Sequence, residues 1–250
     1  MPSFLCLGAQ IWSSDGSKML FLVDTKASEG EMDVSMKGIA SSLNFIFIGG
    51  SNGIISVISE KDHKFELVHE IRTSERCEIT CLFATDQLLL AGNEKGDLFI
   101  YKITSSFEEL CKFVGFGFMV TSVLLEESVA VAAYSSGHIR IFRLSLSRFG
   151  RRGMNELAIE LCAHCRCINA LALYSSKNIF ASCGEDQMLN IWELSSFTGS
   201  EAISVKLIFN EKVDNRLLTG VTFFGDGRLA VVAYDDDKFL LFNPITSTTP

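Results

Sequence analysis

The chain has 250 residues, 48% of them hydrophobic, and a formal net charge of −8 at pH 7. It can therefore bury a sizeable core, and we expect a single domain over residues 1–250. The acidic balance argues against nucleic-acid partners and lends little support to binding at a membrane surface. No apolar run approaches the roughly 18 residues of a membrane span, and no signal-like segment follows Met1, so a soluble, cytoplasmic protein without membrane insertion is expected.

The first predicted elements are two short strands at residues 8–12 and 18–24, joined by a polar turn at 13–16. Beyond them the chain repeats an apolar hairpin unit of 23 to 25 residues five times. The spacers carry a further apolar stretch, as at 65–71 and 202–208, so each unit should belong to a four-stranded sheet. The hairpin units cover residues 36–58, 79–101, 120–142, 168–192 and 218–242.

Each hairpin unit contains three apolar runs, and the break between the second and third is a polar turn typical of a tight hairpin. The second run carries a small residue that lets neighbouring sheets approach closely. These small residues are Gly49, Gly92, Ala133, Cys183 and Ala233. Continuous apolar runs such as 129–133 indicate strands that are covered on both faces.

Four short antiparallel strands in roughly 40 to 45 residues are the signature of a β-propeller blade, in which each sheet packs face to face on the next. A single blade cannot bury both of its faces alone. The predicted fold class is therefore all-β, a β-propeller of four-stranded antiparallel blades with five hairpin units and a partial N-terminal blade.

The fourth hairpin unit resembles a WD repeat. Ala163-His164, Ser182, Asp186 and Trp192-Glu193 stand where that family carries Gly-His, Ser or Thr, Asp and Trp-Asp. The resemblance implies a structural tetrad of His164, Ser182, Asp186 and Trp192, hydrogen-bonded to one another. The chemistry suits these residues, because a buried indole N–H and imidazole need partners and a turn carboxylate accepts from several donors.

The other hairpin units depart from the family pattern. None of them closes with Trp, and their turns carry Asn52, Lys95, Ser136 or, without a Ser/Thr or Trp companion, Asp236. The family's rings typically have seven blades, whereas the strands at 8–12 and 18–24 read as the third and fourth of a first blade and the last unit lacks its fourth. We expect an N-terminally shortened form. Alternatively, a strained six-bladed ring closes with residues 4–7.

One motif suggests catalysis. Gly49-Gly50-Ser51-Asn52-Gly53 matches the G-x-S-x-G string of serine hydrolases. A nucleophile elbow needs a turn from a strand into a helix, but here another strand follows at once. We therefore do not expect catalysis by Ser51 and predict no catalytic residue.

The segment Cys162-Ala163-His164-Cys165-Arg166-Cys167 gathers four soft donors that zinc accepts. Their spacing is poor, His164 already has a role in the repeat, and no second C-x₂-C pair lies elsewhere. No metal and no cofactor are predicted. The eight cysteines of the chain are expected to be reduced and mostly buried, with redox sensitivity of the cluster as an alternative.

Two segments are candidate partner contacts. Phe116 and Phe118 lie between glycines and methionine in a spacer, where exposed rings suit a binding hot spot, although either ring can instead tuck between blades. The basic cluster Arg148, Arg151 and Arg152 suits an acidic partner, or is a solvated loop.

The predicted function is a non-catalytic scaffold that binds other proteins, as the family resemblance implies. The alternative is a structural subunit of a larger assembly that uses its open blade edge. An enzyme fits less well, because the inner strands begin with apolar or small residues and the chain has only four histidines.

Overall fold

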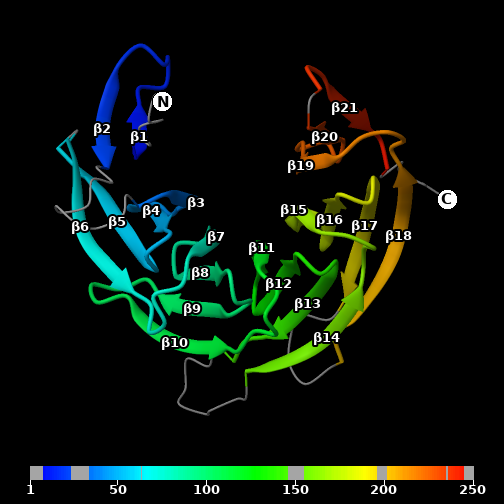
Figure 1. Ribbon diagram of the computed structural model, residues 1–250, viewed down its shortest axis with the longest axis horizontal. Coiled ribbons are helices and arrows are strands. Elements are labelled where there is room, and N and C mark those ends of the chain that lie inside the picture. The colour runs from blue at the N-terminus through cyan, green and yellow to red at the C-terminus, as the bar shows by residue number, and fades with distance from the viewer. Residues whose placement is uncertain are drawn as a thin grey trace, which may run out of the picture. The chain divides into compact units, whose positions relative to one another are not determined.

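The structure is a computed structural model that describes residues 8–23, 34–62, 64–145, 155–195, 202–234 and 236–244. Apart from one 3-10 turn at Ser175–Lys177, every regular element in these ranges is a β-strand (Figure 1). The strands form antiparallel sheets. The chain divides after Gly117 into two compact parts, and each is described by itself.

The N-terminal part, which ends at Gly117, contains three sheets. The first is the hairpin of β1 (Ala9–Trp12) and β2 (Met19–Val23). The second and third have four strands each, paired in chain order. They comprise β3 (Met36–Ser41), β4 (Phe45–Gly50), β5 (Ile54–Lys61) and β6 (Lys64–Arg72), then β7 (Ile79–Ala84), β8 (Leu88–Asn93), β9 (Leu98–Lys102) and β10 (Glu108–Phe113).

The C-terminal part begins at Phe118 and also contains three sheets. Two of them have four strands, and the last has three within the described residues. They comprise β11 (Val120–Glu126), β12 (Val129–Tyr134), β13 (His138–Arg143) and β14 (Glu156–Cys162); β15 (Ile168–Tyr174), β16 (Ile179–Gly184), β17 (Met188–Ser195) and β18 (Ser204–Lys212); and β19 (Leu218–Phe223), β20 (Leu229–Ala233) and β21 (Phe239–Phe242).

These sheets confirm the predicted fold class. The first strands of the five hairpin units begin at the predicted residues, Met36, Ile79, Val120, Ile168 and Leu218. The apolar stretches in the spacers form the fourth strands, as β6 and β18 show. That residues 1–250 form one domain stays a prediction.

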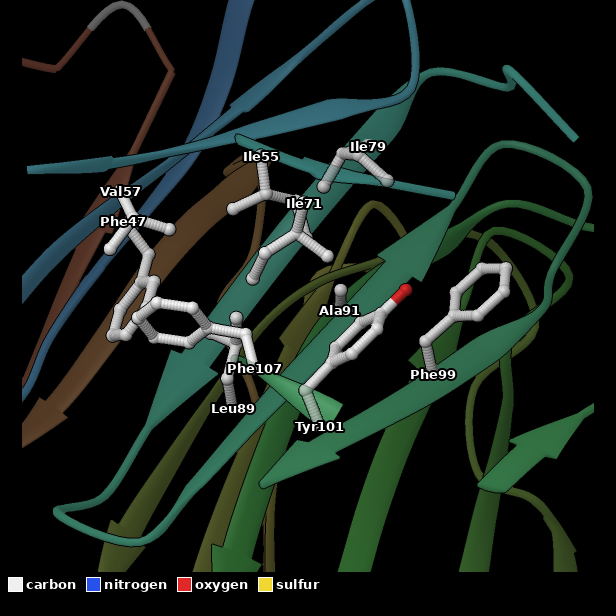
Figure 2. Close-up of a cluster of buried hydrophobic side chains, with 10 residues drawn as sticks. All are labelled: Phe47, Ile55, Val57, Ile71, Ile79, Leu89, Ala91, Phe99, Tyr101 and Phe107. Atoms are coloured by element: carbon white, nitrogen blue, oxygen red, sulfur yellow. The ribbon is translucent and has the colours of Figure 1, made fainter. Parts of the chain in front are cut away.

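The core of the N-terminal part lies between the sheets β3–β6 and β7–β10. Phe47 of β4 packs with Leu89 of β8 and with Phe107, whose ring meets that of Phe47 edge-on at 6.1 Å between centroids. Figure 2 shows these side chains together, with Tyr101 and Phe99 further along β9. Full burial of each such side chain stabilises the fold by about 1.5–3 kcal/mol.

The close contact between these two sheets involves Gly49 of β4, which has no side chain. A Cβ atom added to Gly49 would lie 2.5 Å from Cγ2 of Ile79 and 2.7 Å from the carbonyl oxygen of Lys37. Both separations are far below van der Waals contact, so a side chain at residue 49 would displace Ile79 of β7 and clash with the backbone of β3. This is the close approach that the small residues of the second runs predict.

The core of the C-terminal part follows the same plan. Every residue of β12 and of β16 is buried, as expected of continuous apolar runs. Cys183 of β16 and Ala233 of β20 supply the small residues of a cluster that joins the sheets β15–β18 and β19–β21. Its larger members include Ile191, Leu218 and Leu229.

Candidate functional site

Four side chains from separate elements meet in the sheet β15–β18. His164 lies in the loop before β15, Ser182 on β16, Asp186 in the next turn and Trp192 on β17. Nδ1 of His164 is 2.9 Å from Oδ1 of Asp186, and Nε2 is 2.8 Å from Oγ of Ser182. The indole N–H of Trp192 donates to the same hydroxyl at 3.0 Å. The structure thus brings together all members of the proposed tetrad.

The four side chains form a chain of hydrogen bonds that runs from Trp192 through Ser182 and His164 to Asp186. The indole N–H of Trp192 can only donate, so Oγ of Ser182 accepts from it. The roles of the two ring nitrogens depend on the tautomer of His164: with the ring proton on Nδ1, the imidazole donates to Asp186 and its Nε2 accepts from Ser182. The side chains of His164 and Asp186 are almost fully buried, so leaving one of their polar atoms without a hydrogen bond would destabilise the fold.

Asp186 also fixes the backbone around it. Its Oδ1 accepts the backbone N–H of Met188 at 3.1 Å, which shapes the hairpin turn. Its Oδ2 accepts the backbone N–H of Cys165 at 2.9 Å, which ties the incoming loop to that turn. One carboxylate therefore joins the loop before β15 to the turn between β16 and β17.

Asn190 belongs to this network, although the repeat pattern does not indicate it. It lies opposite Ser182 in the register of β16 and β17 and is buried. Its amide donates to the carbonyl oxygen of Ala163 at 3.0 Å and lies 3.3 Å from Nε2 of His164, while its oxygen accepts from Asn210. The sequence feature that points to Asn190 is its position two residues before Trp192, because residues two apart in a strand lie on the same face.

A second buried carboxylate holds the loop after β10. Asp97, one residue after the turn glycine of the second hairpin unit, is only 3% exposed. It accepts from the backbone N–H of Gly115 at 2.7 Å and from Asn93 at 3.1 Å, and it pairs with Lys112 at 3.0 Å. The repeat pattern does not point to Asp97, because the family's turn carboxylate falls at the position of Lys95 in this unit.

The environment of Asp97 favours its charged form. Burial by itself would raise the pKa of Asp97, but hydrogen bonds from Gly115, Lys112 and Asn93, together with the Lys112 charge, outweigh it and lower the pKa below its usual 3.8. The carboxylate is therefore a permanent acceptor at neutral pH.

The loop anchored by Asp97 carries exposed apolar side chains. We call residues 114–118 the apolar loop: Val114 is 74% exposed, Phe116 57% and Phe118 52%. The backbone N–H of Gly117 donates to the carbonyl oxygen of Lys95 at 3.1 Å. A Cβ atom on Gly115 would lie 2.3 Å from the backbone carbon of Gly96, so the loop reaches the β8–β9 turn only because residue 115 is glycine.

The other candidate contacts, Arg148, Arg151 and Arg152, lie outside the described residues. Ser51 stands in a strand-to-strand turn, where its hydroxyl accepts the backbone N–H of Ser35 at 3.1 Å. The described residues contain no group of three or more His, Cys, Asp or Glu side chains that could hold a metal ion. Nor do they include a helix of the length and apolarity that crossing a membrane requires.

All seven cysteines in the described ranges are free thiols. Three of them, Cys77, Cys81 and Cys183, are buried, and burial raises the pKa of both Cys81 and Cys183 to about 12. Of the clustered cysteines, Cys167 is half-buried, whereas Cys162 and Cys165 are exposed.

A family model described as WDR54 matches residues 5–244. The chain belongs to the WDR54 family. Among curated relatives, WD repeat domain 54 of Rattus norvegicus is 27% identical over 252 residues, which covers 95% of this chain and 72% of the relative. WD repeat-containing protein 54 of Homo sapiens is likewise 27% identical over the same shares. The prediction of a divergent WD-repeat chain that most resembles WD repeat-containing protein 54 is confirmed.

Solved structures agree with the fold of this WDR54-family chain. The β-propeller domain of Cps50 (Swd1) from Myceliophteria thermophila superimposes with a TM-score of 0.72 at 12% identity, over 94% of this chain and 75% of that one. A chain of ctPRC2 in complex with H3K27me3 and H3K27M gives a TM-score of 0.65 at 17% identity, over 84% and 48%. The fold class is a WD-repeat β-propeller.

Proposed function

We propose that this WDR54-family chain is a non-catalytic scaffold that binds other proteins, and that the apolar loop is one of its contacts. The observation that supports the proposal most directly is the pair of large rings, Phe116 and Phe118, each more than half exposed. Aromatic side chains dominate the binding energy of protein interfaces, and grouped exposed apolar residues are unusual on a surface without a partner.

The backbone of the apolar loop makes it suitable for binding. Asp97 accepts the amide of Gly115, and Lys95 accepts that of Gly117, so the main chain on both sides of Phe116 is held before any partner arrives. A contact that is ordered in advance loses little conformational entropy on binding. The WD-repeat fold, whose relatives in solved structures include a chain of the ctPRC2 complex, gives further support.

The polar groups of the fourth hairpin unit support a structural role rather than a catalytic one. His164, Ser182, Asp186 and Trp192 are satisfied by one another and are buried or nearly so. We propose that this tetrad holds the blade together and that the chain uses no cofactor. A cytoplasmic location and binding of an acidic partner by Arg148, Arg151 and Arg152 belong to the same proposal.

The test is differential capture. The tagged chain, the double variant Phe116→Ser/Phe118→Ser and the control Leu43→Ser are used to retain proteins from a cell extract, which quantitative mass spectrometry identifies. Leu43 is 82% exposed in the β3–β4 turn and is thus a matched apolar surface site. The expected result is a set of proteins retained by the wild type and by the control but lost with the double variant.

Equal retention by all three proteins would overturn the assignment of the apolar loop. Direct titration of the most depleted protein, purified, then measures the effect: loss of two anchoring rings should weaken binding by about 2 kcal/mol or more, roughly 30-fold. An unchanged affinity would have the same meaning as equal retention.

The last sheet supports a second candidate, a structural subunit that joins an assembly through its edge. Within the described residues β21 pairs only with β20, and its side chains Phe239 and Leu241 are 61% and 54% exposed. An unpaired strand edge is a site for pairing with another chain. In that case Leu241→Lys should abolish the association of this chain with the other chain of the assembly, whereas Leu43→Ser should leave it intact. Solution mass measures the association.

A further inference from the structure

Cys162 and His138 lie opposite each other at one end of the sheet β11–β14. His138 is the first residue of β13 and Cys162 the last of β14, and the two are register partners across the strands. Sγ of Cys162 is 3.4 Å from Nε2 of His138, within hydrogen-bond distance for sulfur. On the other side of the ring, Nδ1 lies 3.1 Å from Oγ of Ser136.

The backbone holds this pair in place. The carbonyl oxygen of Gly137 accepts the backbone N–H groups of Ala163 and His164 at 3.1 and 3.0 Å, directly after Cys162. A Cβ atom at Gly137 would lie 2.2 Å from the carbonyl oxygen of His164, so the turn before His138 packs tightly on the loop that leaves Cys162. Thiol and imidazole therefore face each other without any rearrangement.

We infer that Cys162 and His138 form a nucleophilic thiol–imidazole pair at which soft electrophiles, peroxides among them, modify the chain. A thiol reacts as its thiolate, and an imidazole within hydrogen-bond distance takes up the proton as the sulfur attacks. Exposure of Cys162 gives a reagent access to the sulfur. The inference rests on this pair alone and holds whether or not the apolar loop binds a partner.

A hydroperoxide is one electrophile that the pair can reduce. Sγ of Cys162 attacks one peroxide oxygen, the S–O bond forms and the O–O bond breaks. The thiol proton, accepted by Nε2 of His138, passes to the leaving hydroxide or alkoxide and gives water or an alcohol. The sulfur is oxidised by two electrons to a sulfenic acid and the peroxide is reduced.

The other described thiols differ from Cys162 in access or surroundings. Burial raises the pKa of Cys111 to about 11 and also raises the pKa of Cys167. Cys77 is buried and its thiol lies 3.3 Å from the backbone oxygen of Glu75. Cys165 is exposed like Cys162, and its backbone N–H, rather than its sulfur, donates to Asp186. It is the internal control.

The experiment measures alkylation by iodoacetamide at pH 7 in the native full chain. Samples quenched over time are digested with trypsin, and fragment ions separate Cys162 from Cys165 within the peptide that ends at Arg166. The expected result is that Cys162 reacts about 100-fold faster than Cys165 or more, the lower end of what a positioned base provides. A parallel sample treated with hydrogen peroxide and dimedone should carry the sulfenic-acid adduct on Cys162.

Two histidine variants decide the role of the imidazole. His138→Gln should slow Cys162 to the rate of Cys165, whereas His69→Gln, which alters a histidine on β6, should leave both rates unchanged. Local loosening of the sheet would instead raise both rates together, so Cys165 reports on the fold in the same spectrum. Equal rates in the wild type, or a Cys162 rate that His138→Gln does not lower relative to Cys165, would overturn the inference.

Discussion

Asn190 and Ser182 face each other across β16 and β17, and both contact the same ring nitrogen of His164. One ring nitrogen of the imidazole therefore lies between two neighbours, and the other lies against Asp186. This arrangement makes Asn190 as much a part of the network as the four residues that resemble the WD pattern.

The buried amide of Asn190 should contribute to the stability of the fold. Asn190→Ala leaves the carbonyl oxygen of Ala163 and the amide of Asn210 without that partner, so it should destabilise the fold by about 1–3 kcal/mol. Asn44→Ala, at an exposed site, should stay within about 0.5 kcal/mol of wild type. Urea unfolding gives both values, and equal midpoints for the two variants would contradict the prediction. Adding Ser182→Ala should give a non-additive double variant.

Trp192 allows the hydrogen bond to be separated from packing. Trp192→Phe removes the donor to Ser182 but keeps a ring stacked near Phe180, whose centroid lies 6.2 Å from that of the indole. The expected cost is about 1 kcal/mol for the phenylalanine and about 3–5 kcal/mol for Trp192→Ala. Thermal unfolding followed by circular dichroism measures both. If Trp192→Phe were as costly as Trp192→Ala, ring packing would not account for the larger part of the stabilisation, and the prediction would be wrong.

Asp97 makes stability depend on pH in a defined direction. Its pKa is lower in the folded chain than its usual 3.8, so the stabilisation is fully present above that value and is lost as the pH falls below it. The variant Asp97→Asn should therefore be less stable than wild type at pH 7, and the difference should shrink as the pH falls from about 4 towards 3. Thermal midpoints across this range test it, and a difference that stays constant would refute it.

Gly115 and Gly117 should respond differently to alanine. A Cβ atom on Gly115 meets backbone atoms of residues 95–97 within 2.3–2.7 Å, whereas Gly117 has open space but a φ of +81°. Gly115→Ala has to displace the loop and should cost more than about 2 kcal/mol, against about 1–2 kcal/mol for Gly117→Ala. Denaturant midpoints rank the two variants. Partner binding should fall with Gly115→Ala even where the fold persists.

The repeat pattern of the sequence predicts the strands well because burial is a local property of each run. A continuous apolar stretch such as 129–133 has to be covered on both faces, and β12 is. The tetrad is predictable from the resemblance of the fourth hairpin unit to a WD repeat, in which these residues occupy fixed positions. Three of its members share the hairpin of β16 and β17, and His164 joins them from the loop before β15.

The parts that sequence reasoning missed depend on partners from distant segments. The residue two before the closing position is a buried polar side chain in three units, Ser56, Arg140 and Asn190, but what each one bonds is set by the loops and strands packed around it. In the second hairpin unit the carboxylate that holds the neighbouring loop is Asp97, two residues after Lys95, which occupies the family's Asp position. Asp97 reaches the apolar loop through the backbone N–H of Gly115. The exposure of Phe116 and Phe118 likewise depends on where Gly115 touches the neighbouring turn.

The two backbone bonds that hold the apolar loop have a kinetic consequence. A partner that docks on Phe116 meets a main chain that is already in place, so no slow ordering step separates encounter from complex. The observed association rate should then rise in proportion to partner concentration without reaching a plateau, and changes in affinity should appear in the dissociation rate.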